Sequence, residues 1–118
     1  MKVLVIIKSP PASQVVHEIA TNTIGQLCSN SEVEISGIFF TDSSVSLSSK
    51  GICQISSLCN LQENYLKISK NMSIPLFVCG RAFMEQGLAK ENICDGFVLS
   101  GNMELSMLIC STDKILEF

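Results

Sequence analysis

Cysteine is the residue type that offers this sequence its clearest chemistry. The chain has six cysteines, at positions 28, 53, 59, 79, 94 and 110, and a single histidine, His17. No two cysteines form a CxxC pair, so the spacing favours neither a zinc ribbon nor a thioredoxin-like motif. Disulfides are rare in a reducing cytoplasm, where we expect this chain to reside, so all six cysteines are predicted to be thiols.

Cys79 is distinguished by its place in the segment IPLFVCGRAFMEQGL, residues 74–88. An apolar, strand-like run ends at Cys79 and a helix-like stretch begins directly after it. Sites in open parallel α/β sheets form beyond the C-terminal ends of strands, and the start of a helix favours a thiolate. Arg81 could add positive charge, and Gly80 leaves room for a partner sulfur. The alternative is a buried cysteine that only packs.

The other cysteines are weaker candidates. Cys28 and Cys110 lie in apolar helical stretches, which is typical of core positions. Cys53 and Cys59 lie in or beside the serine-rich segment 41–60, where either could act as a resolving thiol for the cysteine at the strand end. The segment itself is expected to be a long loop, functional or mobile, with some helix toward its end and some apolar side chains packed.

Apolar runs alternate with helical patterns along the whole chain. Strands are expected at residues 3–7, 33–40, 75–79, 97–99 and 114–118, with helices at about 16–27, 58–72, 80–86 and 102–108. This alternation predicts the α/β class: residues 1–118 form one domain, a three-layer sandwich with a mostly parallel five-stranded sheet and helices on both faces, as in flavodoxin-like topologies.

Composition limits the classes of partner. The chain of 118 residues carries a formal charge of −3, so no basic face attracts nucleic acid. Charged residues make up 16% of the chain, against about 25% in typical domains, which favours oligomer interfaces. The apolar run Val3–Ile7 is shorter than the roughly seven residues of a signal-peptide core, and no run approaches a membrane span. A cytoplasmic protein without membrane contact is therefore expected.

Other functional motifs are missing. The sequence has no GxGxxG, GxxxxGK or GxSxG pattern, so neither a nucleotide cradle nor a nucleophile elbow is indicated. An anion could still bind after the first strand, at Ser9–Ser13, as in flavodoxin-like sites. Pro10 and Pro11 lack N–H groups, which weakens this alternative.

Around Cys79, the stretch LFVCGRAFMEQGL resembles the DsrE/TusD family of small sulfur-carrying proteins. VEISGIFFTDSSV is similar to the family's second strand and following loop, and GFVLSGNMELSMLICSTDKILEF to its closing stretch. Gly87, eight residues after the cysteine, is the most telling further match. Glu85 and Gln86 stand where the family usually has paired basic residues.

The resemblance implies a DsrE-like fold and a sulfurtransferase that works as a persulfide relay. Cys79 would accept sulfane sulfur from a donor carrier protein and pass it to an acceptor protein, without a metal or organic cofactor. In TusD-like members the sulfur reaches 2-thiouridine at the tRNA wobble position, without direct contact with nucleic acid; in DsrE-type members it belongs to sulfur oxidation. The family assembles as a heterohexamer with two related small subunits, some of which only support assembly.

Overall fold

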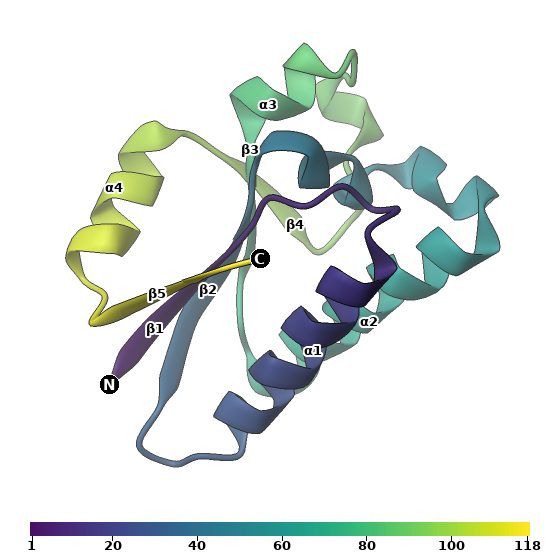
Figure 1. The fold of residues 1–118 in the computed structure, drawn as a ribbon. Helices are drawn as coiled ribbons and strands as arrows, with labels where there is room; N and C mark the ends of the chain where they lie inside the picture. Colours follow the sequence, from purple (N-terminus) through teal and green to yellow (C-terminus); the bar gives the residue numbers. More distant parts are fainter.

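The computed structural model describes residues 1–118, which fold around one five-stranded sheet (Figure 1). Its strands are β1 (Lys2–Ile7), β2 (Glu34–Phe40), β3 (Leu76–Cys79), β4 (Phe97–Ser100) and β5 (Lys114–Glu117). All neighbouring strands pair in parallel, in the order β4-β3-β2-β1-β5. The predicted α/β sandwich is therefore confirmed. Its strand order is not the flavodoxin order 2-1-3-4-5, because β2, β3 and β4 follow one another to the same side of β1.

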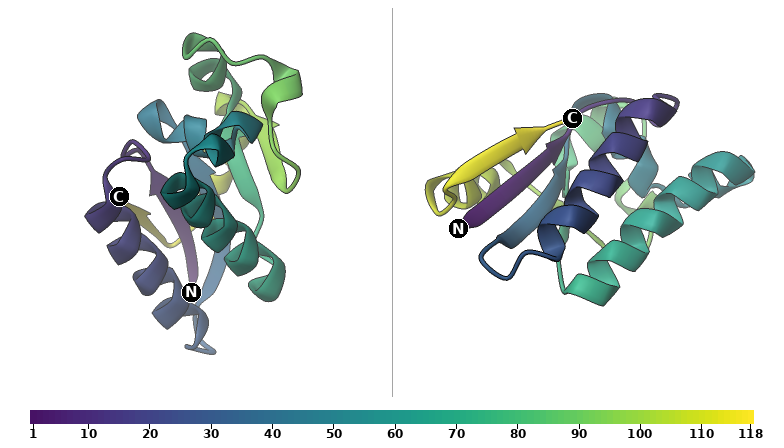
Figure 2. Two further views of the ribbon diagram at one scale, coloured as in Figure 1. Left: turned by 90° about the vertical axis from the view of Figure 1, so that its right-hand side faces the viewer. Right: turned by 60° about the horizontal axis from the view of Figure 1, so that its bottom comes forward.

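Four α-helices connect the strands. They are α1 (Gln14–Cys28), α2 (Ser56–Met72), α3 (Gly80–Glu85) and α4 (Asn102–Cys110), with short 3₁₀ helices η1 (Asp42–Ser48), η2 (Lys50–Gln54) and η3 (Lys90–Asn92). Helices α1 and α2 lie side by side on one face of the sheet and α4 lies on the other (Figures 1 and 2). Among these helices there is none whose length and hydrophobicity would let it span a lipid bilayer.

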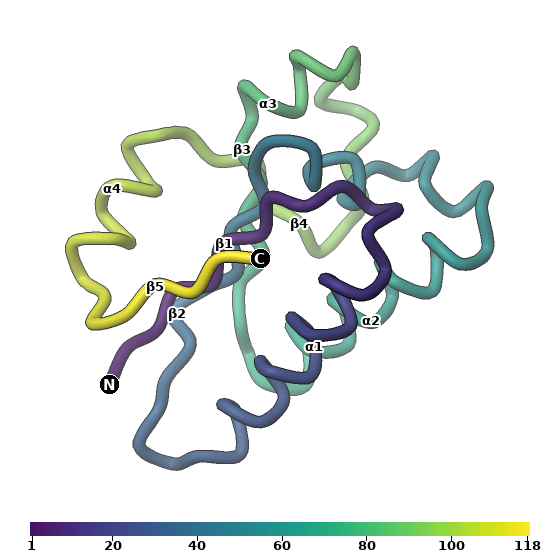
Figure 3. Tube along the Cα trace, in the orientation of Figure 1, coloured from purple at the N-terminus to yellow at the C-terminus, as the bar shows by residue number.

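The sheet has an apolar core on each face because alternate residues of a strand point to opposite sides. In β1, Val3, Val5 and Ile7 belong to the large core under α1 and α2. Leu4 and Ile6 belong to a smaller core, against which α4 packs. Every residue from Val3 to Ile7 is buried, as expected of a parallel strand covered on both faces. The chain trace in Figure 3 shows β5 running beside β1, which places the last strand at a sheet edge.

The serine-rich segment does not form the predicted long loop. It folds into η1 and η2, and α2 already begins at Ser56. Val45 and Leu47 are fully buried, which confirms that part of the segment packs. The buried Ser44 hydroxyl donates to the Ile7 carbonyl at 2.7 Å. Serine hydroxyls thus bond to nearby backbone and hold η1 against the end of β1.

Candidate functional site

Cys79 lies at the junction that the sequence predicted. It is the last residue of β3, it pairs with Ser100 of β4, and α3 begins at Gly80. Its side chain is half-buried and packs against the apolar cores of both sheet faces. Because every strand is parallel, this junction lies at the edge where all five strands end, which is where open α/β sheets place their sites.

Helix α3 is held in place by the segment that follows β2. The Gln86 side chain donates from Nε2 to the Asp42 carbonyl at 3.1 Å, which ties the end of α3 to η1. Phe83 of α3 is fully buried in the larger core. Gly87 has a φ of +78°, in the left-handed region that favours glycine, and it ends the helix as predicted. The short helix that follows Cys79 is therefore held in place by contacts with η1 and with the larger core.

The charged residue expected to assist Cys79 is engaged elsewhere. Arg81 donates from Nε to Glu85 Oε1 at 3.0 Å, and both side chains are largely exposed. The Cys79 side chain also makes no hydrogen bond to the first N–H groups of α3. The expected contacts from the guanidinium and the helix start are thus not formed. Glu85 and Gln86, at the positions where the resembled family usually has paired basic residues, instead bind Arg81 and η1.

A groove of about 560 Å³ runs beside the residue that follows Cys79. Its lining is mainly apolar and comprises Gly80, Phe83, Met84, Gly87, Leu88, Ala89, Lys90, Glu91 and Leu99. A Cβ atom added to Gly80 would lie 3.5 Å from the Ser100 carbonyl oxygen, an ordinary contact distance. Glycine is therefore not required there by the backbone, but its missing side chain keeps this part of the groove open.

Two cysteines are not the thiols that the sequence predicted. The structure joins Cys53 and Cys59 in a disulfide, and the four free cysteines are Cys28, Cys79, Cys94 and Cys110. The turn from η2 into α2 brings the pair together, with their Cα atoms 4.2 Å apart. The bond leaves neither sulfur free to resolve an intermediate on Cys79.

The remaining free thiols differ in burial: Cys28 and Cys94 are half-buried, whereas Cys110 is exposed. Burial raises the pKa of the Cys28 thiol. Burial is the main cause that raises the pKa of the Cys94 thiol. The Asp95 carboxylate also raises this pKa, and the positive charge of Lys50 lowers it. Cys110 is exposed at the end of α4, so its prediction as a core residue was wrong. Raised pKa values reduce the thiolate population, so Cys28 and Cys94 are poor nucleophiles.

His17 is a buried packing residue that ties together neighbouring segments. It is fully buried; its Nδ1 lies 2.9 Å from the Tyr65 hydroxyl, and its Nε2 lies 3.2 Å and 3.0 Å from the carbonyls of Ser9 and Pro10. Since carbonyls only accept, Nε2 carries the proton and Nδ1 accepts from Tyr65. Burial raises the pKa of Tyr65, which keeps its hydroxyl protonated. The imidazole therefore fixes the loop after β1.

The anion site considered at Ser9–Ser13 lacks free donors. The Ser9 N–H donates to the Phe118 carbonyl at 3.3 Å and the Ser13 N–H to the Pro10 carbonyl at 3.0 Å. Pro10 and Pro11 have no N–H group. Most backbone donors of the loop are thus used within the protein, which removes the basis for this alternative.

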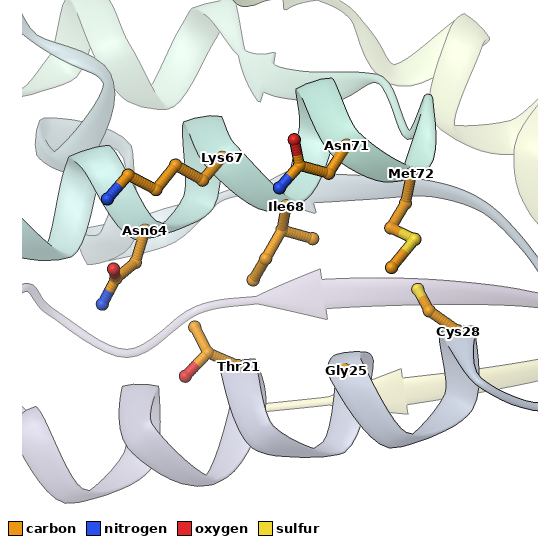
Figure 4. A pocket seen from close by; sticks show the side chains of 8 residues that line it. All are labelled: Thr21, Gly25, Cys28, Asn64, Lys67, Ile68, Asn71 and Met72. Atoms are coloured by element: carbon orange, nitrogen blue, oxygen red, sulfur yellow. The ribbon is translucent and has the colours of Figure 1, made fainter.

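A second groove, of about 290 Å³, lies between α1 and α2 on the face covered by these helices (Figure 4). Its residues are Thr21, Gly25, Cys28, Asn64, Lys67, Ile68, Asn71 and Met72. Figure 4 shows Cys28 and Met72 at one end and the polar side chains of Asn64 and Lys67 toward the other. No group of three or more His, Cys, Asp or Glu residues is arranged to hold a metal ion here or elsewhere.

The whole chain matches one protein family and has a fold similar to solved structures. Residues 1–118 match the model of the DsrE/DsrF-like family. The fold is similar to the ychN protein from E. coli, with a TM-score of 0.74, 17% identity, and coverage of 100% of this chain and 99% of that one. It is also similar to MTH1491, a protein of unknown function from Methanobacterium thermoautotrophicum, with a TM-score of 0.59, 11% identity, and coverage of 99% and 97%. A search of curated proteins found no match.

Proposed function

Because the chain belongs to the DsrE/DsrF-like family, which is linked to sulfur transfer, we propose that it is a sulfurtransferase of a sulfur relay and that Cys79 carries the sulfur. The observation that supports this most is the place of Cys79. It is the free thiol that ends a strand at the carboxyl edge of the sheet, and the next residue, Gly80, lines a mainly apolar groove. The other three free thiols are not at a strand end.

The chemistry would be transfer of a sulfane sulfur between cysteines. The Cys79 thiolate attacks the outer sulfur of a donor persulfide, the donor S–S bond breaks, and the donor cysteine leaves as a thiolate. Cys79 then holds the sulfur as a persulfide until an acceptor thiolate attacks its outer sulfur in the same way. No electrons are gained or lost overall, and the rate follows the thiolate fraction and the access to the sulfur.

As the family resemblance implies, the source of sulfur would be a carrier protein. The mainly apolar groove next to Gly80 would receive the segment of this carrier that brings its own cysteine to Cys79. An acceptor protein would use the same approach after the donor has left. This gives the chain an upstream sulfur-carrier protein and a downstream acceptor protein as partners.

The face of the sheet covered only by α4 supports assembly with other subunits. Several large apolar side chains are exposed there, namely Val98, Met103, Met107 and Ile115. Exposed apolar surface of this kind marks protein interaction sites. We place two related small subunits there, in a heterohexamer like that of the resembled family.

The destination that we favour is 2-thiolation of the tRNA wobble uridine, in the cytoplasm, as in the TusD-like members of the DsrE/TusD family that the chain resembles. The net charge of −3 argues against direct contact with the tRNA. A sulfur-oxidation carrier of the DsrE type would use the same thiol with different partners.

A second candidate is a structural subunit that does not carry sulfur. The half-buried Cys79 side chain and the absence of a cap hydrogen bond from it favour this alternative. In that case the thiol would only pack between the two apolar cores.

Peptide mass spectrometry distinguishes these functions. The protein is incubated with a cysteine desulfurase, cysteine and a small sulfur-carrier protein, and Cys79 is expected to gain the mass of one sulfur atom that reductant removes. Cys79→Ser should lose this gain, whereas the matched control Cys110→Ser, which removes an exposed thiol, should retain it. Normal loading in Cys79→Ser would rule out the proposed role. No loading of Cys79, combined with a thiol that resists alkylation, would favour the structural subunit.

A further inference from the structure

The disulfide between Cys53 and Cys59 lies outside the candidate site and joins η2 to the first turn of α2. Cys53 is exposed and Cys59 is half-buried, so a small reagent in solution can reach the bond. Access to a sulfur atom is one of the conditions that control thiol–disulfide exchange. This bond is therefore placed where exchange can occur without unfolding the core.

Each sulfur of the pair also faces an oxygen acceptor. Cys53 Sγ lies 3.4 Å from Gln62 Oε1, and Cys59 Sγ lies 3.8 Å from Glu63 Oε1. A disulfide sulfur has no hydrogen to donate, whereas a thiol does. The same arrangement of side chains can therefore satisfy the two cysteines as thiols once the bond is opened.

The surroundings of Gln62 give this second state a specific stabilising contact. Gln62 is only 3% exposed, and its Nε2 donates to the carbonyls of Leu47 at 2.7 Å and Ser49 at 2.9 Å. These bonds fix the amide, so its Oε1 points to Cys53. The Cys53 thiol is the side-chain donor within reach of that oxygen. Reduction thus replaces a covalent link with a hydrogen bond to a buried acceptor.

We propose that Cys53 and Cys59 form a reversible disulfide–dithiol site, separate from Cys79, which low-molecular-weight thiols open and their disulfides close. A thiolate attacks the exposed Cys53 sulfur, the Cys53–Cys59 bond breaks, and its electron pair leaves on Cys59, which takes up a proton. A second thiolate attacks the resulting mixed disulfide at the sulfur of the small molecule and releases Cys53. Overall, one disulfide and two small thiols become two cysteine thiols and one small disulfide.

The structural consequence is confined to one corner of the molecule. The bond closes a short loop between η2 and α2, so its reduction removes the covalent restraint on η2. The bonds from Gln62 to Leu47 of η1 and to Ser49, which follows η1, remain in the dithiol, so η1 keeps its place. Amide hydrogen exchange in residues 50–55 is expected to rise by roughly tenfold on reduction, with no change in the strands.

The test is a titration of the full chain in buffers with stepped ratios of reduced to oxidised glutathione, followed by alkylation and peptide mapping. The peptides containing Cys53 and Cys59 are expected to pass from linked to doubly alkylated, and to become linked again when the ratio is reversed. Exchange in residues 50–55 should follow the same transition. The Cys53→Ser and Cys59→Ser variants should lose this transition. The control Cys110→Ser, which removes an exposed cysteine in α4, should retain it.

Three results would overturn the proposal: a link that persists in excess reduced glutathione under native conditions, cysteines that never link in excess oxidised glutathione, or a link to another cysteine of the chain. The Cys79→Ser variant should give the same titration as the unaltered chain. Failure of sulfur loading on Cys79 would therefore leave this result unaffected, and the two proposals can fail separately.

Discussion

Replacing Tyr65 by phenylalanine should destabilise the protein by about 2 kcal/mol although only one oxygen atom is removed. Tyr65 is fully buried, and its ring lies edge-on to Phe40 with centroids 5.0 Å apart. Phenylalanine keeps this packing. It removes the hydroxyl that donates to His17 Nδ1 at 2.9 Å.

The predicted loss of stability comes from the buried His17 Nδ1, which loses its hydrogen-bond donor. His17 is fully buried, and its Nε2 is already directed at two backbone carbonyls, so Nδ1 would have no donor in the variant. An unsatisfied buried group of this kind costs about 1–3 kcal/mol. In a His17→Leu background the same Tyr65→Phe change should cost less, because no acceptor remains. The difference between the two costs is the coupling energy of the pair.

Urea unfolding followed by far-ultraviolet circular dichroism measures these energies, because the chain has no tryptophan and Tyr65 is its only tyrosine. A loss below about 0.5 kcal/mol in Tyr65→Phe, well under the usual cost of an orphaned buried acceptor, would refute the assignment of Tyr65 as the donor. A coupling energy near zero would also contradict it.

The same contact predicts a dependence of stability on alkaline pH. Burial raises the pKa of Tyr65 in the folded state above that of the unfolded chain, so the stabilising contribution is complete below about pH 10 and is lost as the pH rises further. The loss can reach about 1.4 kcal/mol for each pH unit. Phenolate absorbance should therefore appear together with unfolding, and Tyr65→Phe should lack this component of the slope. Phenolate formation in the folded protein near pH 10 would contradict the burial argument.

Two further predictions test packing and thiol reactivity. Gly37→Ala should destabilise the fold by about 1–3 kcal/mol, because its Cβ would lie 2.8 Å from a ring carbon of Phe77; urea unfolding measures this, and the control Gly25→Ala, with nothing within 4 Å, should not destabilise. Cys28, whose pKa is raised by burial, should react with iodoacetamide more slowly at neutral pH than the exposed Cys110. Equal rates by peptide mapping would contradict that order.

The strands and the junction at Cys79 were predictable because their signals are local. The run from Val3 to Ile7 is apolar at every position, short and mostly β-branched, which is typical of a strand covered on both faces. The end of β3 is similarly marked by the change from an apolar run to a helical pattern. Parallel pairing then places Cys79 at the carboxyl edge without further information.

The disulfide, the serine-rich segment and Cys110 depend on contacts that the sequence does not encode locally. Cys53 and Cys59 meet only because the chain turns between η2 and α2. Serine favours loops, but Ser44 bonds to the Ile7 carbonyl and stabilises η1. Cys110 follows an apolar stretch, yet α4 is covered on one side only, so periodicity did not reveal its exposure.

The pair formed by Arg81 and Glu85 leads to a last prediction, about the reactivity of Cys79. Arg81 lies two residues after Cys79, but its Nε donates to Glu85 at 3.0 Å. Glu85→Gln removes the carboxylate charge, so the guanidinium can attract a thiolate at the start of α3. An exposed ion pair is worth about 0.2–1 kcal/mol, so alkylation of Cys79 by iodoacetamide should become faster by up to roughly fivefold. The double variant Arg81→Ala/Glu85→Gln is the control and should lose the gain. An unchanged rate in Glu85→Gln would mean that Arg81 does not act on the thiol.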